Sequence, residues 1–474
     1  MTIWAPRLEA GQSRYLAIAD AIARDVHSGV LSPGERLPTH RDLAKALGVT
    51  VGTVSRGFAE AERRGLTQGE VGRGTYVRNR ASVASVPAAW QDGLSTAAAE
   101  QATLAHGSVD LTLSLPVTLP GEGELLARTL RELADDESVV ELLGYRQESG
   151  SHRQRALAAR WLSRLDLHRP AEDILITAGS QHGLNVVFSS LFAPGDVLLT
   201  EAVTYPSIKS QARAFGVRLR GVEMDDQGAI PESIERWCHK TPKPTAIYLV
   251  PTLQNPTVAM MSQTRRREII QVAERNGLWI IEDDVHAFLP EEPSIPMAAL
   301  APERTVYLAS VAKCLAPGLR TGYLLTPPAL RSRHLAGIHT TLWMAPPLTV
   351  ELTSRWLEDG TADELIRRKR QATAERQQRA KELLSDLPSG TVLHSHPAAY
   401  HLWLELPEPW CADDLVLQAR ERGVHLLGAG VFAVSRRNVP HALRLSIGVP
   451  TTDQLDRALR MLAELIHGGG APCY

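Results

Sequence analysis

The chain is poor in aromatic residues, has few cysteines and lacks any long hydrophobic run. The last two shortages argue against a disulfide-bonded protein and a membrane-spanning protein. Aromatic residues make up 5% of the 474 residues, and the formal net charge is −2 at pH 7. No segment approaches the roughly 18 uninterrupted apolar residues of a membrane-spanning helix, so no membrane partner is expected. The first residues include Arg7 and Glu9 where a secretory signal needs an apolar core. We therefore expect a cytoplasmic protein.

The few potential metal ligands are also badly spaced. The four cysteines are dispersed and form no C-x-x-C pair, which favours a reduced intracellular chain: Cys238, Cys314, Cys411 and Cys473. His394, His396 and His401 lie close together in sequence but have no cysteine or carboxylate partner at ligand spacing. We expect no metal site.

Length and charge distribution predict several domains with different partners. A chain of 474 residues with 44% hydrophobic residues can form two or three domains with sizeable cores. Residues 1–80 carry 12 Lys and Arg against 8 Asp and Glu, whereas the whole chain carries 51 against 53. A mildly basic head on an acidic body is compatible with DNA binding by the head.

Residues 1–78 are predicted to form a small α+β domain. Apolar residues recur at helical spacing over residues 15–29. Thr39 and Thr50 are candidate N-caps of two short helices separated by Gly48. The glycine-rich segment 69–77 predicts a hairpin. Two short helices followed by a hairpin indicate a winged helix-turn-helix, whose second helix enters the major groove of DNA.

The rest of the chain is predicted to be a linker followed by two domains. Residues 79–107, rich in Ala, Ser, Gln and Thr, are typical of a linker. Between residues 108 and 330, short apolar strands alternate with amphipathic helices, which predicts a large α/β domain with a mainly parallel sheet. The expected strands are 174–177, 197–201, 246–250, 279–282 and 305–309. Residues 331–474 are expected to form a smaller α+β domain, with a helix at 362–384 and strands at 401–406 and 442–447.

The most informative residues are a lysine and an arginine after the last of these large-domain strands. Lys313 follows the apolar run 305–309, and Arg320 comes seven residues later across a Pro-Gly turn. A lysine at a strand end in a cleft can lose its proton and form a Schiff base, and a nearby arginine can hold a phosphate. The chemistry of pyridoxal 5′-phosphate (PLP) requires such a pair.

The head resembles the GntR family on four segments: LPTHRDLA (37–44), LGVT (47–50), TVSR (53–56) and GRGTYV (72–77). The resemblance implies contacts to a double-stranded DNA operator by Arg41, Thr50, Thr53, Arg56, Gly72, Arg73 and Gly74. One position departs from the family pattern, because Val51 stands where an arginine is frequent. That difference suggests an apolar contact at this position, for example to a thymine methyl group.

The body resembles the fold-type I aminotransferases, and with its head the chain resembles MocR-type regulators. The resemblance implies a PLP cofactor bound to Lys313, with Asp283 on the pyridine nitrogen and Asn255 on the phenolate oxygen. Asp284 is an alternative to Asp283, since neighbouring residues of a strand point in opposite directions. The implied phosphate-binding residues are Gly179, Ser180, Gln181, Ser310 and Arg320.

Three further residues take roles from the same resemblance. Tyr205 is expected to stack on the cofactor ring, and Tyr145 to reach the phosphate of the partner subunit in a homodimer. Arg444 is expected to pair with an effector or substrate carboxylate. Two positions depart from the family pattern, because Val285, followed by His286, replaces a tyrosine that contacts the phenolate oxygen, and Ala312 replaces a serine.

The combined pattern predicts a DNA-binding transcriptional regulator that senses a small amine or amino acid through PLP held as a lysine aldimine. The alternative is an active PLP-dependent aminotransferase that carries a DNA-binding head, so enzymatic activity stays open at this point. A regulator that has lost PLP is disfavoured, because Lys313, Asp283, Asn255 and Arg320 are all present.

Overall fold

The chain divides into two units, residues 1–91 and 92–474. The computed structural model describes residues 13–27, 35–63, 66–70, 74–77, 107–407, 410–435 and 439–468, together with Trp4, Pro6, Val30, Leu31 and Arg437. We call the described parts of the two units the head (up to residue 77) and the body (from residue 107). No helix among the described residues is both long enough and apolar enough to cross a membrane.

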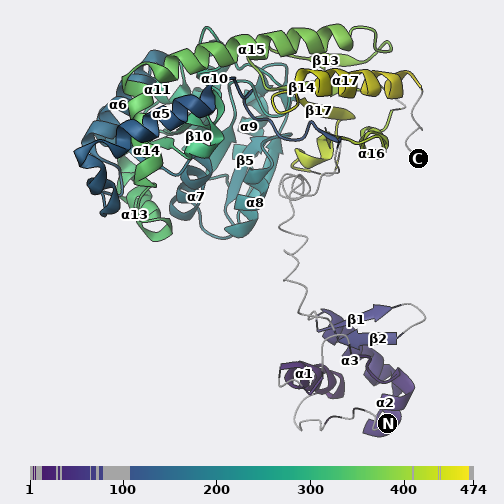
Figure 1. Ribbon diagram of the computed structural model, residues 1–474. Coiled ribbons are helices and arrows are strands. Elements are labelled where there is room, and N and C mark those ends of the chain that lie inside the picture. The colour runs from purple at the N-terminus through teal and green to yellow at the C-terminus, as the bar shows by residue number, and fades with distance from the viewer. Residues whose placement is uncertain are drawn as a thin grey trace. The chain divides into compact units, whose positions relative to one another are not determined.

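The head consists of three helices and an antiparallel hairpin (Figure 1). Its elements are α1 (Arg14–His27), α2 (His40–Leu47), α3 (Val51–Arg63), β1 (Thr67–Glu70) and β2 (Gly74–Val77). The Thr39 hydroxyl caps α2 by accepting from the Asp42 backbone N–H at 3.2 Å, and Gly48 ends the helix with φ of 62°. Thr50 accepts from the Thr53 backbone N–H at 3.2 Å at the start of α3. The predicted winged helix-turn-helix is confirmed, although Gly72 and Arg73 lie outside the described residues.

A seven-stranded sheet forms the centre of the body. Its order is β4 (Ile174–Thr177), β12 (Gly322–Leu325), β11 (Thr305–Ser310), β10 (Trp279–Asp283), β9 (Ala246–Leu249), β5 (Val197–Glu201) and β6 (Arg218–Val222). Only β12 runs antiparallel to its neighbours. All residues of β4, β5, β9, β11 and β12 are buried, as expected for a sheet covered on both faces. The predicted mainly parallel α/β sheet is confirmed.

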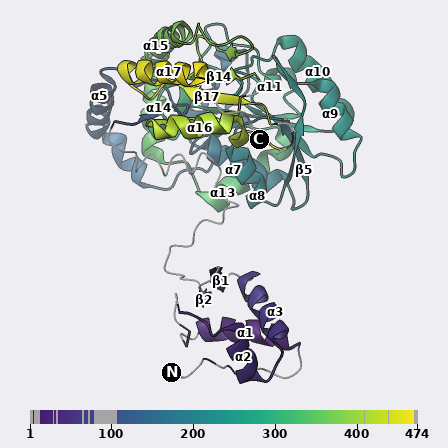
Figure 2. The same cartoon turned by 90° about the vertical axis from the view of Figure 1, so that its right-hand side faces the viewer.

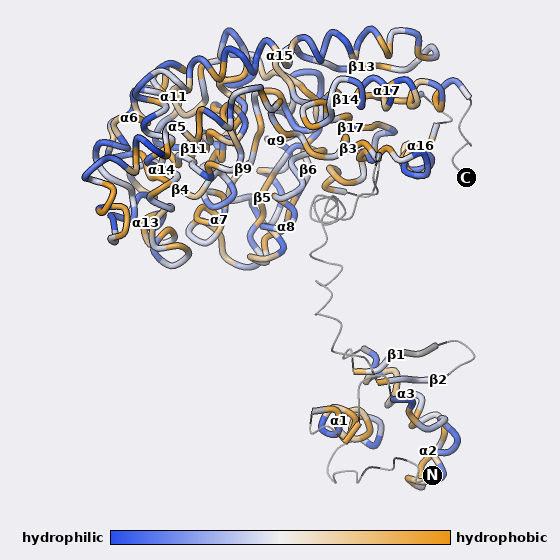
Figure 3. The backbone as a smooth tube through the Cα atoms, in the orientation of Figure 1, coloured by the Kyte–Doolittle hydropathy of each residue, from blue (hydrophilic) through white to orange (hydrophobic). Residues whose placement is uncertain are grey.

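Helices cover both faces of this sheet. One face packs against α7 (Ser180–Leu191), α8 (Ser207–Ala214) and α13 (Arg331–Thr341). The other packs against α9 (Pro231–Cys238), α10 (Gln263–Asn276) and α11 (Met297–Leu300). Two further helices lie side by side next to β4, namely α6 (His152–Leu162) and α14 (Pro347–Glu358). Figure 3 shows hydrophobic residues concentrated along the central strands, which locates the main core of the body there.

A second, antiparallel sheet lies in the C-terminal part of the body. Its order is β13 (Val392–His394), β14 (His401–Glu405), β17 (Ala442–Ser446) and β16 (Leu427–Gly428). The helices α16 (Ala412–Glu421) and α17 (Thr452–His467) pack beside it, as Figures 1 and 2 show. The long helix α15 (Thr361–Leu383) contributes to the main core at its start and to this smaller core at its end.

Strand β3 and the helices α13 and α14 pack against elements that are distant from them in sequence. Strand β3 (Val109–Asp110) pairs in parallel with β15 (Val424–His425), so Val109 and Leu111 lie in the smaller core. Helix α13 packs on α7, and α14 on α6, within the larger core. The boundary at residue 330 stays a prediction, and this packing supports a smaller domain that also includes residues 109–111. The remaining α-helices and strands among the described residues are α5 (Glu122–Ala134), β7 (Met224–Asp225), β8 (Gly228–Ala229) and α12 (Val311–Cys314).

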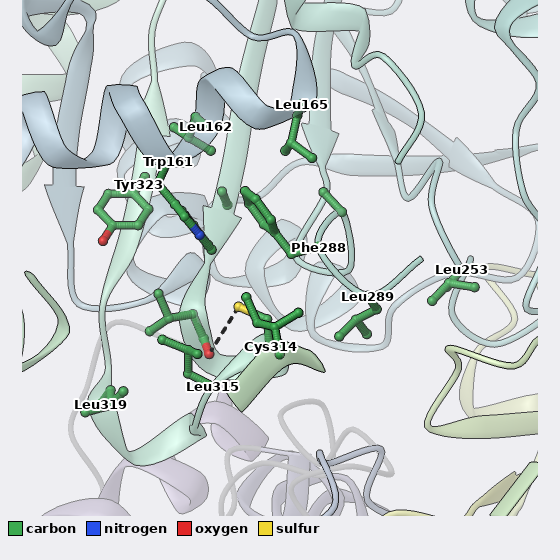
Figure 4. Packing of buried hydrophobic residues seen from close by; sticks show 14 of the residues in the cluster. Trp161, Leu162, Leu165, Leu253, Phe288, Leu289, Cys314, Leu315, Leu319 and Tyr323 are labelled. Atoms are coloured by element: carbon green, nitrogen blue, oxygen red, sulfur yellow. Dashed lines mark hydrogen bonds between the residues drawn. The ribbon is translucent and has the colours of Figure 1, made fainter. Parts of the chain in front are cut away.

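The short helix α12 rests on an aromatic core. The rings of Trp161 and Phe288 stack with centroids 3.7 Å apart, and Cys314 and Leu315 are buried in the same cluster (Figure 4). Cys314 contacts the backbone oxygens of Ser310 and Val311 through its sulfur. This packing holds the backbone on either side of residue 313 in place.

Candidate functional site

The chemically important residues of the body follow strands that end at one edge of the central sheet. Tyr205 follows β5, Asn255 follows β9, Asp283 ends β10, and Lys313 lies in α12 directly after β11. Because these strands are parallel, their carboxyl ends meet at the same edge, where open α/β sheets bind ligands. One pocket there is lined by Ser180, Tyr205, Tyr248, Val250, Asn255, Asp283, Val285, His286, Ala312 and Lys313.

Contacts of its side-chain nitrogen and of its backbone hold Lys313 in this pocket. The Ser310 hydroxyl caps α12 by accepting from the Ala312 backbone N–H at 3.2 Å. Lys313 Nζ donates to the backbone oxygen of Ser114, and its own carbonyl accepts from the Tyr400 hydroxyl at 2.8 Å. Burial, and then the charge of Arg444, lower the pKa of Lys313 to about 8. The neutral fraction of this amine near pH 7 is therefore larger than that of an ordinary lysine, although the ammonium form still predominates.

The two adjacent aspartates are separated by strand alternation. Asp283 lines the pocket, and the Tyr248 hydroxyl donates to its Oδ2 at 2.7 Å. Burial raises the pKa of Asp283 to about 6, while the hydrogen bond from Tyr248 opposes this rise. Asp284 is equally buried but does not line the pocket, and its Oδ2 accepts from Tyr307 at 3.3 Å. The geometry therefore brings Asp283, and not its rival, next to Lys313.

A close approach of three strands builds a tight corner beside the pocket, at the predicted phosphate site. In the register of the sheet, Gly322 pairs with both Thr177 and Ser310. A Cβ atom on Gly322 would lie 2.7 Å from the carbonyl carbon of Gly179, so only glycine permits this approach. Gly179 itself has φ of 84° and precedes the N-terminus of α7, whose unpaired N–H groups attract anions.

Arg320 and Ser310 flank this corner in different ways. The Arg320 guanidinium donates to the Ala178 backbone oxygen at 3.1 Å, and a Cβ atom on Gly179 would lie 2.8 Å from Arg320 Nη2. Arg320 is exposed and adopts a positive φ of 45°. The buried Ser310 hydroxyl instead donates to the Thr321 backbone oxygen at 3.0 Å. Arg320 is thus available to an anion, whereas the hydroxyl hydrogen of Ser310 is already used.

This corner is linked to Tyr205, the residue predicted to stack on the cofactor ring. Gln181, in the first turn of α7, donates from Nε2 to the Tyr205 hydroxyl at 2.9 Å. Tyr205 is partly buried and lines the pocket together with Ser180. Tyr205 is thus connected to the first turn of α7, but of the five predicted phosphate-binding residues only Ser180 lines the pocket.

Arg444, on the smaller sheet, contacts Asn255 directly. It is 1% exposed on β17, and its Nη1 donates to Asn255 Oδ1 at 2.9 Å. Its Nη2 donates to the Thr112 backbone oxygen, and its guanidinium lies 4.8 Å from the ring centroid of Phe432. Its Nε has no hydrogen-bond partner among the described residues. Arg444 thus has a fixed position and one donor that is unpaired among the described residues, but it does not line the pocket.

Tyr145 is a predicted cofactor residue that lies on an exposed surface, away from the pocket. Its side chain is 82% exposed, and its ring lies 5.3 Å from that of Trp343, which is also exposed. Leu143, two residues earlier, is 87% exposed. Within one chain, Tyr145 therefore contributes nothing to the pocket.

Two polar residues of the pocket had no predicted role. Tyr248 lies within an apolar strand, where a tyrosine carries no signal beyond that of a core residue. His286 follows Asp283 by three residues and lines the pocket; burial lowers its pKa to about 3, so its ring is neutral. Its position three residues after a strand-end aspartate was the available signal.

The head presents its predicted DNA-binding residues on α2 and α3. Arg41, Thr50 and Arg56 are exposed, Thr53 is half-buried, and Gly74 begins β2. The guanidinium of Arg56 lies 4.2 Å from the ring centroid of Tyr15. His40 on α2 hydrogen-bonds Ser55 on α3 at 2.9 Å, which fixes the two helices against each other. Gly72 and Arg73 lie outside the described residues.

Comparison with known proteins gives the same division of the chain. The family model "Bacterial regulatory proteins, gntR family" matches residues 14–77, and "Aminotransferase class I and II" matches residues 120–462. The chain is 28% identical to the HTH-type transcriptional regulator YdeF of Bacillus subtilis, over 98% of this chain and 96% of that protein. It is 26% identical to the HTH-type regulator YisV of the same species, over 97% of each chain.

Solved structures resemble the body. The α-aminoadipate aminotransferase LysN of Thermus thermophilus, complexed with N-(5′-phosphopyridoxyl)-L-leucine, is 26% identical and aligns with a TM-score of 0.68. This alignment covers 78% of the present chain and 94% of LysN. The chain therefore belongs to the aminotransferase class I and II family and carries a gntR-family regulatory domain at its N-terminus.

Proposed function

We propose that this protein is a DNA-binding transcriptional regulator that senses a small amine or amino acid through PLP bound in its body. The observation that carries this proposal is the presence, in one chain, of a winged helix-turn-helix and of a pocket that contains both a lysine and an aspartate. Relatives named as HTH-type regulators share both parts over almost their full length. This similarity supports DNA binding by the head and amine sensing by the body. Because its target is DNA, we place its action in the cytoplasm.

The residues of the pocket fit PLP. Asp283 Oδ1 is buried without a hydrogen-bond partner among the described residues, so it can accept from a protonated pyridine nitrogen. The cradle at Gly179, which a Cβ atom would fill, suits a phosphate next to Arg320 and the N-terminus of α7. Asn255 would donate to the phenolate oxygen, and Tyr205 would cover the ring. Bound PLP supplies an electrophilic carbon that captures primary amines.

Lys313 and Arg444 have distinct roles in this proposal. Lys313 would hold the cofactor covalently, and its lowered pKa provides the neutral amine that this requires. An effector amine competes with Lys313 for the same carbon. Arg444 would bind the carboxylate of an amino-acid effector, because its Nε is unpaired among the described residues and its position is held by Asn255.

We further propose that the body functions as a homodimer. Val140 and Leu143, which precede Tyr145 in sequence, are 64% and 87% exposed, and Trp343, whose ring lies 5.3 Å from that of Tyr145, is 45% exposed. Tyr145, whose ring lies beside that of Trp343, is the residue that would complete the partner's phosphate site. Apolar side chains exposed in this number are typical of a surface that another chain covers.

The decisive test uses the variant Lys313→Ala. Duplexes that the protein binds are first selected from random DNA, and binding is then measured by fluorescence anisotropy with PLP and a panel of amino acids and amines. We expect the variant to retain basal DNA binding and to lose every response to the panel, whereas the exposed-lysine control Lys381→Ala retains both. An unchanged response in Lys313→Ala would contradict the proposed mechanism.

The same preparations distinguish regulation from catalysis. With an amino acid, a sensor changes its cofactor absorbance once and then stops. An aminotransferase converts the cofactor to its amine form, and an added keto acid reverses that conversion. Sustained turnover without any effect on DNA binding would favour the aminotransferase alternative.

A further inference from the structure

Tyr248 and Asp283 form a buried pair beneath the pocket. Tyr248 lies on β9 and Asp283 ends the adjacent parallel strand β10, where Ile281 is the register partner of Tyr248. The Tyr248 hydroxyl donates to Asp283 Oδ2 at 2.7 Å. Tyr248 is 0% exposed and Asp283 is 4% exposed, and both line the pocket with Lys313. Water therefore does not compete for this hydrogen bond.

The two oxygens of the Asp283 carboxylate have different surroundings. Oδ2 accepts from Tyr248, whereas Oδ1 has no partner among the described residues. A buried carboxylate oxygen without a donor is costly, so a ligand N–H is the natural partner of Oδ1. The carboxylate is thus held from one side by the protein and left available on the other.

The Tyr248 hydroxyl stays protonated. Burial, and then the charge of Asp283, raise the pKa of Tyr248 well above its usual value, so the phenol stays a donor. Its hydrogen bond favours the ionised form of Asp283, against the effect of burial. A carboxylate stabilised in this way is a weaker base. When Asp283 faces a pyridine nitrogen, the shared proton then resides on the nitrogen rather than on the carboxylate.

We propose that Tyr248 is a positioning residue that orients Asp283 and keeps the proton on the pyridine nitrogen of bound PLP. The proposal rests on the proposed binding of PLP in this pocket. Tyr248 does not touch the reacting atoms, and it acts only through Asp283. It thereby sets both the affinity for PLP and the electron-withdrawing strength of the ring.

The test compares Tyr248→Phe with the control Tyr307→Phe. Tyr307 lies on β11, is 0% exposed and donates to Asp284, so the control removes an equally buried hydroxyl that does not face the pocket. Each full-length variant is reconstituted with PLP labelled with ¹⁵N in the ring. We expect Tyr248→Phe to bind PLP on the order of ten-fold more weakly. Its ring ¹⁵N signal should move toward that of neutral pyridine, whereas Tyr307→Phe should match the unmodified protein in both measurements.

The possible results separate this proposal from the one on which it rests. If the unmodified protein binds no PLP, the proposed function fails. If it binds PLP and Tyr248→Phe has the same affinity and ¹⁵N signal, the role of Tyr248 is wrong. Should Tyr248→Phe not fold, 3,5-difluorotyrosine at position 248 preserves the hydroxyl and strengthens it as a donor. The ring signal must then move toward protonated pyridine, and an unchanged signal would also overturn the proposal.

Discussion

The guanidinium of Arg444 donates to the side-chain oxygen of Asn255 at 2.9 Å, across 189 residues of sequence. Because this oxygen is occupied, the amide nitrogen of Asn255 is the group left to donate within the pocket. One arginine on the smaller sheet thus orients a pocket residue of the larger sheet. The same arginine carries the unpaired Nε that we assign to an effector carboxylate.

Replacing Arg444 should discriminate between effectors with and without a carboxylate. In Arg444→Lys the guanidinium fork is lost, and we expect the affinity for alanine to fall by about 1.5–3 kcal/mol, the typical value of a charged hydrogen bond. Ethylamine, which has the amine but no carboxylate, should bind within about two-fold of its original affinity. Absorbance titration of the PLP-loaded protein measures both. An equal loss for the two compounds would show that Arg444 supports the pocket without contacting the carboxylate.

Capture of PLP should depend on the ionisation of Lys313. The pKa of Lys313 is lowered to about 8 from the usual 10.5, and only the neutral amine reacts with an aldehyde. The rate should therefore rise with pH up to about 8 and then level off, whereas a surface lysine would continue to gain up to about 10.5. Stopped-flow absorbance of the cofactor-free protein mixed with PLP gives this profile.

A second variant tests the cause of that shift. The charge of Arg444 also lowers the pKa of Lys313, so Arg444→Gln should move the inflection of the capture rate to higher pH. If the inflection stays near pH 8 in Arg444→Gln, burial alone lowers the pKa of Lys313.

Val51 should read a thymine methyl group in the operator. It begins α3 with 44% of its surface exposed, and the preceding Thr50 caps the same helix. Replacing the contacted thymine by uracil removes one methyl group, which should weaken binding by about 0.8 kcal/mol, or roughly four-fold. The measurement is fluorescence anisotropy on selected duplexes in which each thymine is replaced in turn. The penalty should disappear in Val51→Ala, and a uracil penalty of the same size in that variant would rule out the contact.

Arg266 and Glu282 should be essential for stability rather than for binding. Both side chains are 0% exposed, and Arg266 Nη1 lies 3.0 Å from Glu282 Oε1. Removing one partner leaves a buried charge, so Arg266→Ala should lower the free energy of unfolding of the body by about 3–5 kcal/mol. Arg275→Ala, which breaks an exposed pair with Glu235, should cost about 1 kcal/mol or less. Urea unfolding of both variants makes the comparison, and similar midpoints would contradict this role.

Local patterns predicted much of the fold, because they depend on neighbouring residues. The strand Ile174–Thr177 has the predicted bounds, and the helix expected at 362–384 spans Thr361–Leu383. Thr39 and Gly48 limit α2 as their side-chain chemistry predicts. The strand β12 was missed, because its short apolar run follows the Pro-Gly turn closely and its antiparallel pairing depends on β4, far away in sequence.

By itself the sequence determined the two-part organisation, the helix and strand periodicities and Lys313 as the candidate Schiff-base residue, since spacing and residue type encode these features locally. The family resemblance added Asn255 and left Asp283 and Asp284 as alternatives. Only the tertiary structure decided which aspartate lies beside Lys313, that Tyr248 supports it and that Arg444 orients Asn255. It also placed Tyr145 outside the pocket of its own chain. These relationships depend on sheet register and on packing between distant segments, and a linear pattern of residues does not carry that information.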